Sequence, residues 1–249
     1  MLRRPINSVF RPGTASGCLI LETERKDLKD EQICTLTSGP PPSMDYKKLS
    51  EEISKKMLPY LKDASGWKQI KKGKLITVSM RPSTDYLGNT YRVEATIEQL
   101  PEKVFPFIYL PEYRAKWDKS LQSYKVVDTI DQDTAIYHSI THSYGFGLVP
   151  PRDFVYMVHI KKYNGILTTN STSVNHPKCP PCQSYIRGQA YPSGFACSPS
   201  PENPQHCKMV AVIQVDLGGK LLPSVIQSVM PTSLVNLITD IRAGIKKLK

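Results

Sequence analysis

The spacing of apolar residues changes along the chain and divides it into helical and extended segments. From Tyr46 to Tyr60 apolar residues recur every three or four positions, which predicts an amphipathic helix that ends near Pro59. Beyond Trp67 the period falls to two, and the alternation over 91–98 predicts a half-buried strand. Further strands are expected at roughly 74–80, 123–130, 134–143, 154–162, 166–174, 184–189 and 208–217, and short helices at 101–108 and 111–116.

After Pro223 the helical period returns and predicts a long C-terminal helix. Pro231 lies within it and should kink it, because proline removes a backbone donor and crowds the preceding turn. One apolar stripe runs along one side of this helix and consists of Met230, Leu234, Leu237, Ile241, Ile245 and Leu248.

A helix, many antiparallel strands and a final long helix indicate an α+β fold with one curved sheet. Roughly eight or nine strands are expected. The C-terminal helix is the only long element to cover them, and a helix is about 10 Å wide. The sheet must therefore curl around the helix or leave a cavity beside it, an arrangement suited to holding a ligand.

Charge and composition limit the partners and the location. Residues 1–43 lack periodicity and predict a disordered N-terminal extension, with a second domain over 44–249. Arg3, Arg4 and Arg11 resemble part of a mitochondrial presequence, but Pro5 and Pro12 interrupt the helix that such a signal needs, so targeting is not favoured. No apolar run reaches the roughly 18 residues of a spanning helix, and a cytoplasmic protein is expected.

The net charge of +11, from 33 basic and 22 acidic residues, favours an anionic partner. Residues 44–249 carry 27 of the basic and 17 of the acidic residues, so the charge belongs to the second domain. Nucleic acid or an anionic membrane would fit. Cations interleaved with stacking aromatics occur only near 113–117 and 161–163, which does not favour nucleic acid.

Signatures of catalysis and metal binding are weak. The chain has no phosphate-binding glycine loop, no nucleophile elbow and no zinc-protease motif. His138 and His142 would lie roughly 13 Å apart on a strand, too far to share a metal. Cys179 and Cys182 form a Cys-x-x-Cys without a second close pair, since Cys197 and Cys207 are ten positions apart. A non-enzymatic protein without metal or cofactor is expected.

The stretch SYGFGLVPPRDFV, residues 143–155, combines helix and strand breakers with large apolar side chains. Gly145, Gly147, Pro150 and Pro151 prevent one helix or strand from continuing through it. Its apolar side chains, Phe146, Leu148 and Val149, are ones that a surface loop normally avoids. An apolar loop therefore separates two strands.

Seven short motifs, in order and spacing, resemble the START domain, the lipid-transfer module of the steroidogenic acute regulatory protein. The resemblance covers about 45–248 and is nearest to the small, soluble, single-domain subgroup. The motifs are Ala64-Ser-Gly-Trp-Lys68, Gly88-Asn-Thr-Tyr-Arg-Val-Glu94, Lys116-Trp-Asp-Lys-Ser-Leu121, Pro151-Arg-Asp-Phe154, Tyr185-Ile-Arg-Gly188, Pro192-Ser-Gly-Phe195 and Asp216-Leu-Gly-Gly-Lys-Leu221.

The resemblance implies a helix-grip fold, in which a curved antiparallel sheet and the C-terminal helix enclose one lipid. Residues 144–151 correspond to the omega loop, which forms a lid with that helix. Phe146, Leu148 and Val149 would then close over the ligand and touch a membrane on docking, or else complete the core. Arg152 and Asp153 would form an ion pair or cap where the loop re-enters the sheet.

The resemblance also implies the positions that contact the lipid. Ser139 and Val158 replace an internal acid–arginine pair of the founding relative, so a less polar cavity is expected, in which Ser139, Thr141 or water meets a sterol hydroxyl. The lipid-facing set on the strands is Tyr137, Ser139, Thr141, Tyr156 and Val158. The set on the helix is Ser233, Leu237, Ile241 and Ile245.

The expected function is non-vesicular carriage of one lipid, most simply a sterol, by a monomer that touches anionic membranes transiently. The membrane-contact residues would be Phe146, Leu148, Arg242, Lys246 and Lys247, the cations of which could hold anionic headgroups. Two alternatives stay open: a lipid sensor that presents its ligand to a protein partner, and a hydrolase or cyclase on the same broad fold.

Overall fold

The computed structural model describes residues 44–63 and 65–247. The expected N-terminal extension, residues 1–43, and Leu248 of the expected stripe lie outside the described residues. None of the helices in the described ranges is both long and apolar enough to cross a bilayer.

The centre of the fold is one antiparallel sheet. Its strands follow the spatial order β1 (Lys68–Gly73), β2 (Ile76–Pro82), β3 (Asn89–Ile97), β11 (Cys207–Ile213), β10 (Gly194–Pro199), β7 (Ile166–Ser173), β6 (Arg152–Tyr163), β5 (Thr134–Thr141) and β4 (Leu121–Thr129). The short β8 (Ile186–Arg187) pairs in parallel with β6, while β9 (Gln189–Ala190) pairs with β12 (Val215–Asp216). The expected α+β fold with one antiparallel sheet is confirmed.

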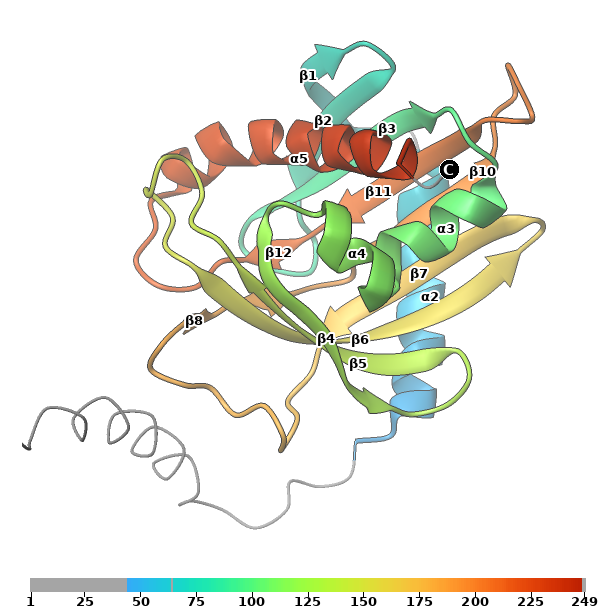
Figure 1. Ribbon diagram of the computed structural model, residues 1–249. Coiled ribbons are helices and arrows are strands. Elements are labelled where there is room, and N and C mark those ends of the chain that lie inside the picture. Colours follow the sequence, from blue (N-terminus) through green and yellow to red (C-terminus); the bar gives the residue numbers. More distant parts are fainter. Residues whose placement is uncertain (1–43, 64, 248–249) are drawn as a thin grey trace, which may run out of the picture. The chain divides into compact units, whose positions relative to one another are not determined.

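Helices cover both faces of the sheet (Figure 1). α3 (Pro101–Tyr109), α4 (Pro111–Trp117) and α5 (Pro223–Ile245) share a hydrophobic cluster with one face, called here the inner face. α2 (Tyr46–Lys62) packs on the outer face through Ile53 and Met57. From the sequence, the C-terminal helix alone was expected to cover the inner face. α3 and α4, each opened by a proline at its first turn, cover it as well.

The alternation of β3 shows which side chains belong to each face. Arg92 donates hydrogen bonds to the carbonyl oxygens of Tyr60 and Leu61 at the end of α2, so its side chain lies on the outer face. Tyr91 and Val93, on either side of it, join the inner cluster. The period-two pattern of this segment therefore marks the inner face correctly.

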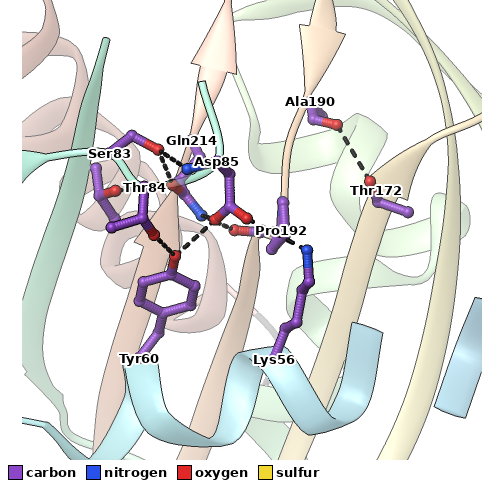
Figure 2. Close-up of polar contacts among 10 residues, drawn as sticks. Lys56, Tyr60, Ser83, Thr84, Asp85, Thr172, Ala190, Pro192 and Gln214 are labelled. Atoms are coloured by element: carbon purple, nitrogen blue, oxygen red, sulfur yellow. Dashed lines mark hydrogen bonds and ion pairs between the residues drawn. The ribbon is translucent and has the colours of Figure 1, made fainter. Parts of the chain in front are cut away.

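A buried amide fastens the outer face at one end of the sheet (Figure 2). Gln214, fully buried between β11 and β12, accepts hydrogen bonds from Ser83 and Thr90, both at 2.7 Å. It donates to the carbonyl of Pro192 at 2.6 Å and to Asp85 at 3.2 Å. Asp85 also pairs with α2 side chains, Tyr60 at 2.6 Å and Lys56 at 3.4 Å. One network thus ties α2, the β2–β3 loop and the sheet together.

Several element boundaries differ from the prediction. The first helix continues past Pro59 to Lys62, whereas α5 runs through Pro231 as one long helix, as predicted. β1 escaped prediction because its sequence, KQIKKG, is polar on both sides, as suits an edge strand. β10 escaped because GFACSP is rich in small residues and lacks alternation. The 184–189 segment forms two short strands on either side of Gly188 instead of one.

The buried stripe of α5 is close to the predicted one. It consists of Met230, Leu234, Ile238, Ile241 and Ile245. Leu237, predicted in this stripe, is half-buried, and Ile238 takes the buried position. Leu237 and Ile238 follow Leu234 by three and four residues, so at 100° per residue their side chains project to either side of the direction of Leu234. The spacing alone therefore does not show which of the two is buried.

Candidate functional site

The 144–151 loop is a tight, strained turn with two solvent-exposed apolar side chains. Tyr144 and Val149 exchange backbone hydrogen bonds of 2.8 and 3.1 Å, which close the turn. Phe146 lies in the left-handed region with φ 57°, between Gly145 at 57° and Gly147 at 90°. Phe146 and Leu148 are 110% and 62% exposed, so they point away from the interior. The expectation that these two side chains close over an enclosed lipid is therefore wrong for this conformation.

Val149 points the other way. It is fully buried and packs in a cluster with Phe154 and Leu217 that also includes Val225 and Ile226 of α5. It therefore completes the packing between the loop and the first turns of the helix, which is the core role weighed as its alternative.

Arg152 and Asp153 anchor the loop separately, and the expected pairing between them is absent from the described residues. Neighbours in a strand point to opposite faces. The Arg152 side chain, 1% exposed, donates to the carbonyl oxygens of Leu217, Gly218 and Pro150. Burial lowers the pKa of Arg152. This guanidinium therefore caps the turn that leads into α5.

Asp153 lies on the outer face and pairs with two other side chains. Arg187 contacts it with two hydrogen bonds of 3.0 and 2.8 Å, and His138 approaches it at 3.1 Å. Burial alone would raise the pKa of Asp153, but the bonds from His138 and Arg187 outweigh this effect and lower it to about 2. His138 is thus an ordinary sheet histidine with a carboxylate partner.

Two close backbone approaches hold α5 over the inner face. A Cβ atom on Gly145 would lie 2.7 Å from a methyl carbon of Val229, so the 144–151 loop rests directly on the helix. A Cβ atom on Gly244 would lie 2.5 Å from the Cβ of Trp117 in α4. At 100° per residue Val229 and Gly244 project from neighbouring parts of one side of α5. The loop and α4 therefore hold the same side of the helix.

The predicted strand residues line one wall of the inner face. Register places Tyr137 opposite Tyr156 and Val158 beside Ala135, all on the inner side of β5 and β6. Tyr124, Tyr137 and Tyr156 form a stacked ladder with ring centroids 5.2 and 6.2 Å apart. Burial raises the pKa of Tyr137 to about 12, so its phenol is neutral at physiological pH. The side chains of this wall are aromatic and uncharged, and the guanidinium of Arg114 lies over the ring of Tyr124.

The two hydroxyls on this wall differ in availability. Ser139 and Thr141 are 4% and 5% exposed. The Thr141 oxygen already accepts a hydrogen bond of 3.0 Å from the backbone N–H of Arg152. Its first role is therefore to hold the end of the loop, which weakens its candidacy as a partner of a ligand.

The predicted helix residues divide into two groups. Ser233 and Leu237 are half-buried and project from the same side of α5 as Asp240, which pairs with Lys119 just beyond α4 at 3.0 Å. They therefore border the space between α5, α4 and the loop. Ile241 and Ile245 are buried in the cluster that α5 shares with β2 and β3. Ser233 and Leu237, but not Ile241 and Ile245, therefore lie on the side of α5 that faces the 144–151 loop and α4, called here the lid side.

The predicted cationic residues lie far from the apolar loop. Arg242 is 13 residues beyond Val229, about 20 Å along the helix. Its guanidinium is occupied by the carbonyl oxygens of Lys74, Leu75 and Thr96. Lys246 and Lys247 are exposed at the same end. The five predicted membrane-contact residues therefore do not form one surface.

A pocket of about 210 Å³ opens at that far end of α5. It is smaller than the roughly 300–1,000 Å³ typical of ligand sites, and we do not assign the lipid to it. Its lining consists of Lys74, Leu75, Ile97, Glu98, Arg242, Ile245 and Lys246.

Two features near the inner face escaped the sequence analysis. Arg114 and Asp118 of the Tyr113-Arg-Ala-Lys-Trp-Asp stretch form an ion pair of 3.1 Å, with the guanidinium 5.0 Å from the ring centroid of Tyr124. The i, i+4 spacing could have signalled this pair.

The hydroxyl of Tyr91 is buried and has no hydrogen-bond partner in the described part of the chain. No sequence pattern could have revealed that.

The four cysteines among the described residues are free thiols. Within 44–63 and 65–247, no three potential His, Cys, Asp or Glu ligands lie together. Cys179 is half-buried, and burial raises the pKa of its thiol. Cys197 and Cys207 are fully buried in the inner cluster.

Comparison with known proteins gives a consistent result. Residues 48–249 match the START domain. Human StAR-related lipid transfer protein 6 is 46% identical over 204 residues, 82% of this chain and 93% of that protein. Mouse StAR-related lipid transfer protein 5 is 36% identical over 201 residues, covering 80% and 94%. The solved human StAR-related lipid transfer protein 5 superposes with a TM-score of 0.78 at 32% identity, covering 81% and 97%. The expected helix-grip fold is confirmed by this likeness.

Proposed function

The chain belongs to the START domain family, a lipid-binding and lipid-transfer family, and from this premise we propose that it carries one sterol between membranes through the cytoplasm. The sterol would lie between α5 and the inner face of the sheet, and would be carried without chemical change by a monomer. The relatives named above are called lipid transfer proteins, which supports the general activity.

The physical task is to shield apolar surface from water. A sterol exposes several hundred Å² of such surface, and at about 25 cal/mol per Å² its hydration costs on the order of 10 kcal/mol. An aromatic, uncharged wall built from Tyr137, Tyr156 and Val158 removes that cost without burying an unpaired charge. This wall favours a nearly neutral lipid over one with a charged headgroup.

The observation that carries the proposal is the way α5 is held. The 144–151 loop meets α5 where Gly145 contacts the side chain of Val229, and α4 meets it where the side chain of Trp117 contacts Gly244. Arg152 fixes the turn that leads into α5 by hydrogen bonds to carbonyl oxygens. Such contacts can part while the sheet stays intact, so the loop and the first turns of α5 would open as a lid.

We place the membrane contact at the loop end of α5. Phe146 and Leu148 are exposed there, and the 144–151 loop packs beside the start of the helix, where Leu222 is 67% exposed. Lys220 is exposed in the same turn and could meet an anionic headgroup. Lys246 and Lys247 at the other end are left out of this contact.

The test is a negative charge on the lid side of α5. Leu237→Asp should abolish binding of a fluorescent sterol, because a carboxylate there would have to lose its hydration against the lipid. Leu237 is only half-buried, so the sheet should stay folded, as far-UV circular dichroism would show.

Thr239→Asp is the matched control, because Thr239 is exposed on another side of the same helix. It should bind the sterol as the native chain does. Undiminished sterol binding by the folded Leu237→Asp variant would falsify the assignment of the lipid to this side of α5.

A further inference from the structure

We propose that the hydroxyl of Tyr91 on β3 is the hydrogen-bonding partner of the polar group of the enclosed lipid. This inference rests on the proposed lipid carriage and names the ligand as one with a hydroxyl or carbonyl oxygen. It also gives the ligand an orientation, with its polar end toward β3 and not toward β5.

The position of Tyr91 is fixed by its strand neighbours. Its register partners are Met80 on β2 and Ile213 on β11, and all three side chains belong to the inner cluster with Met230 of α5. Arg92 turns to the outer face and α2. The Tyr91 side chain therefore lies between the sheet and the helices, on the side where the lipid is proposed.

The hydroxyl of Tyr91 is buried without a partner. The residue is 2% exposed, and its oxygen makes no hydrogen bond to any described residue. Burial raises the pKa of Tyr91, and the Asn89 side chain, near enough to interact with the hydroxyl as a hydrogen-bonding group, lowers it. The Asn89 side chain does not meet the geometry of a hydrogen bond to this hydroxyl, so a ligand oxygen would compete with it for the bond. Buried polar atoms in native proteins nearly always have a partner, and each exception calls for an explanation.

At the same end of the sheet, the hydroxyl of another tyrosine, Tyr86, does find hydrogen-bond partners within the protein. Its hydroxyl donates to the carbonyl oxygens of Asn89 at 2.8 Å and Val215 at 3.1 Å. The hydroxyl of Tyr91 makes no such bond to a carbonyl, and its side chain belongs to the inner cluster of apolar side chains. A polar atom on an enclosed ligand would supply the missing bond.

The alternative partner, Ser139, lies on a distant wall. β3 and β5 are five steps apart in the sheet order, so Tyr91 and Ser139 belong to different parts of the curved inner face. Thr141 is already bonded to the backbone of Arg152. The side chain that bonds the ligand's oxygen, Tyr91 on β3 or Ser139 on β5, therefore shows where the polar end of the ligand lies.

The experiment compares two competitors that differ by one oxygen. Cholesterol and cholest-5-ene, which lacks the 3-hydroxyl, each displace a fluorescent sterol from the full chain, both supplied on cyclodextrin. The native chain should prefer cholesterol about tenfold, the value of one buried hydrogen bond. Tyr91→Phe should reduce this ratio to about one, while Ser139→Ala should retain it.

Tyr86→Phe is the matched control, since it removes a hydroxyl that the protein itself satisfies. It should keep the tenfold preference but unfold at a lower temperature, whereas Tyr91→Phe should unfold at the same temperature or higher. A Tyr91→Phe variant that keeps the preference, or a native chain with none, overturns the inference and leaves lipid carriage standing. A native chain that binds no fluorescent sterol contradicts the proposed carriage itself.

Discussion

Replacing Phe146 and Leu148 together by serine should slow vesicle-to-vesicle sterol transfer without weakening sterol binding. Both side chains are exposed and contribute almost nothing to packing, at 110% and 62% exposure. The unfolding free energy should therefore stay within about 0.5 kcal/mol of the native value. Any effect must arise at the membrane.

The size of the effect follows from the area these side chains can bury. Full burial of a Phe or Leu side chain contributes about 1.5–3 kcal/mol. Phe146 can contribute the whole amount, while Leu148, 62% exposed, contributes proportionally less. Together about 3 kcal/mol of membrane affinity should be lost, which corresponds to about a hundredfold weaker vesicle binding.

The assay follows a fluorescent sterol moving from donor to acceptor vesicles, beside equilibrium binding of the same sterol in solution. Leu87→Ser is the control, because Leu87 is 105% exposed in the β2–β3 loop, whose Ser83 and Asp85 are held in the outer-face network around Gln214. The control should transfer sterol normally. Equal loss of transfer and of equilibrium binding in the double variant would refute the reasoning, as would unchanged transfer.

Three further predictions concern stability. Because the pKa of Asp153 is lowered to about 2 by its partners, its stabilisation is complete above the unfolded pKa near 4 and is lost as pH falls toward 2. Urea titrations across this range should show a loss of about 2 kcal/mol that Asp153→Asn removes. Gln214→Ala should lower the unfolding free energy by about 2–4 kcal/mol, since it strands several buried polar groups; a change below 1 kcal/mol would contradict the network. Gly244→Ala should lower the unfolding free energy by about 1–3 kcal/mol, measured by calorimetry, because the added Cβ would lie 2.5 Å from the Cβ of Trp117. An unchanged melting temperature would contradict this and show that α4 moves to make room.

The fold was largely predictable because its strands carry a clear period. The alternation of β3 predicts its inner positions, Tyr91 and Val93, whereas the inward positions Tyr137, Ser139 and Thr141 on β5 came from the resemblance to the START domain. β1 and β10 were not predictable, since one is polar on both sides and the other is built from small residues. Their places in the sheet depend on pairing with strands distant in sequence.

The faces that helices cover were less predictable. The pattern of α3 and α4 predicts helices but does not say which side of the sheet they cover, because that depends on tertiary packing. Within α5, Leu237 and Ile238 are both compatible with a stripe through Leu234, and only the neighbours decide which is buried.

The site was the least predictable part. The outward direction of Phe146 follows from a left-handed backbone that few non-glycine residues adopt. Arg152 and Asp153, adjacent in sequence, were expected to form an ion pair or a cap, and they bond to groups on opposite faces, with Arg152 capping the turn before α5. The unpaired hydroxyl of Tyr91 is a property of its surroundings in three dimensions and leaves no trace in the sequence.

Native mass spectrometry of the intact chain, isolated from eukaryotic cells in gentle buffer, tests the central claim most directly. The account predicts a species heavier than the chain by the mass of one sterol, released on collisional activation and missing from the folded Leu237→Asp variant. A chain that carries no lipid, or a bound lipid that the Leu237→Asp variant retains in the same amount, would contradict the account.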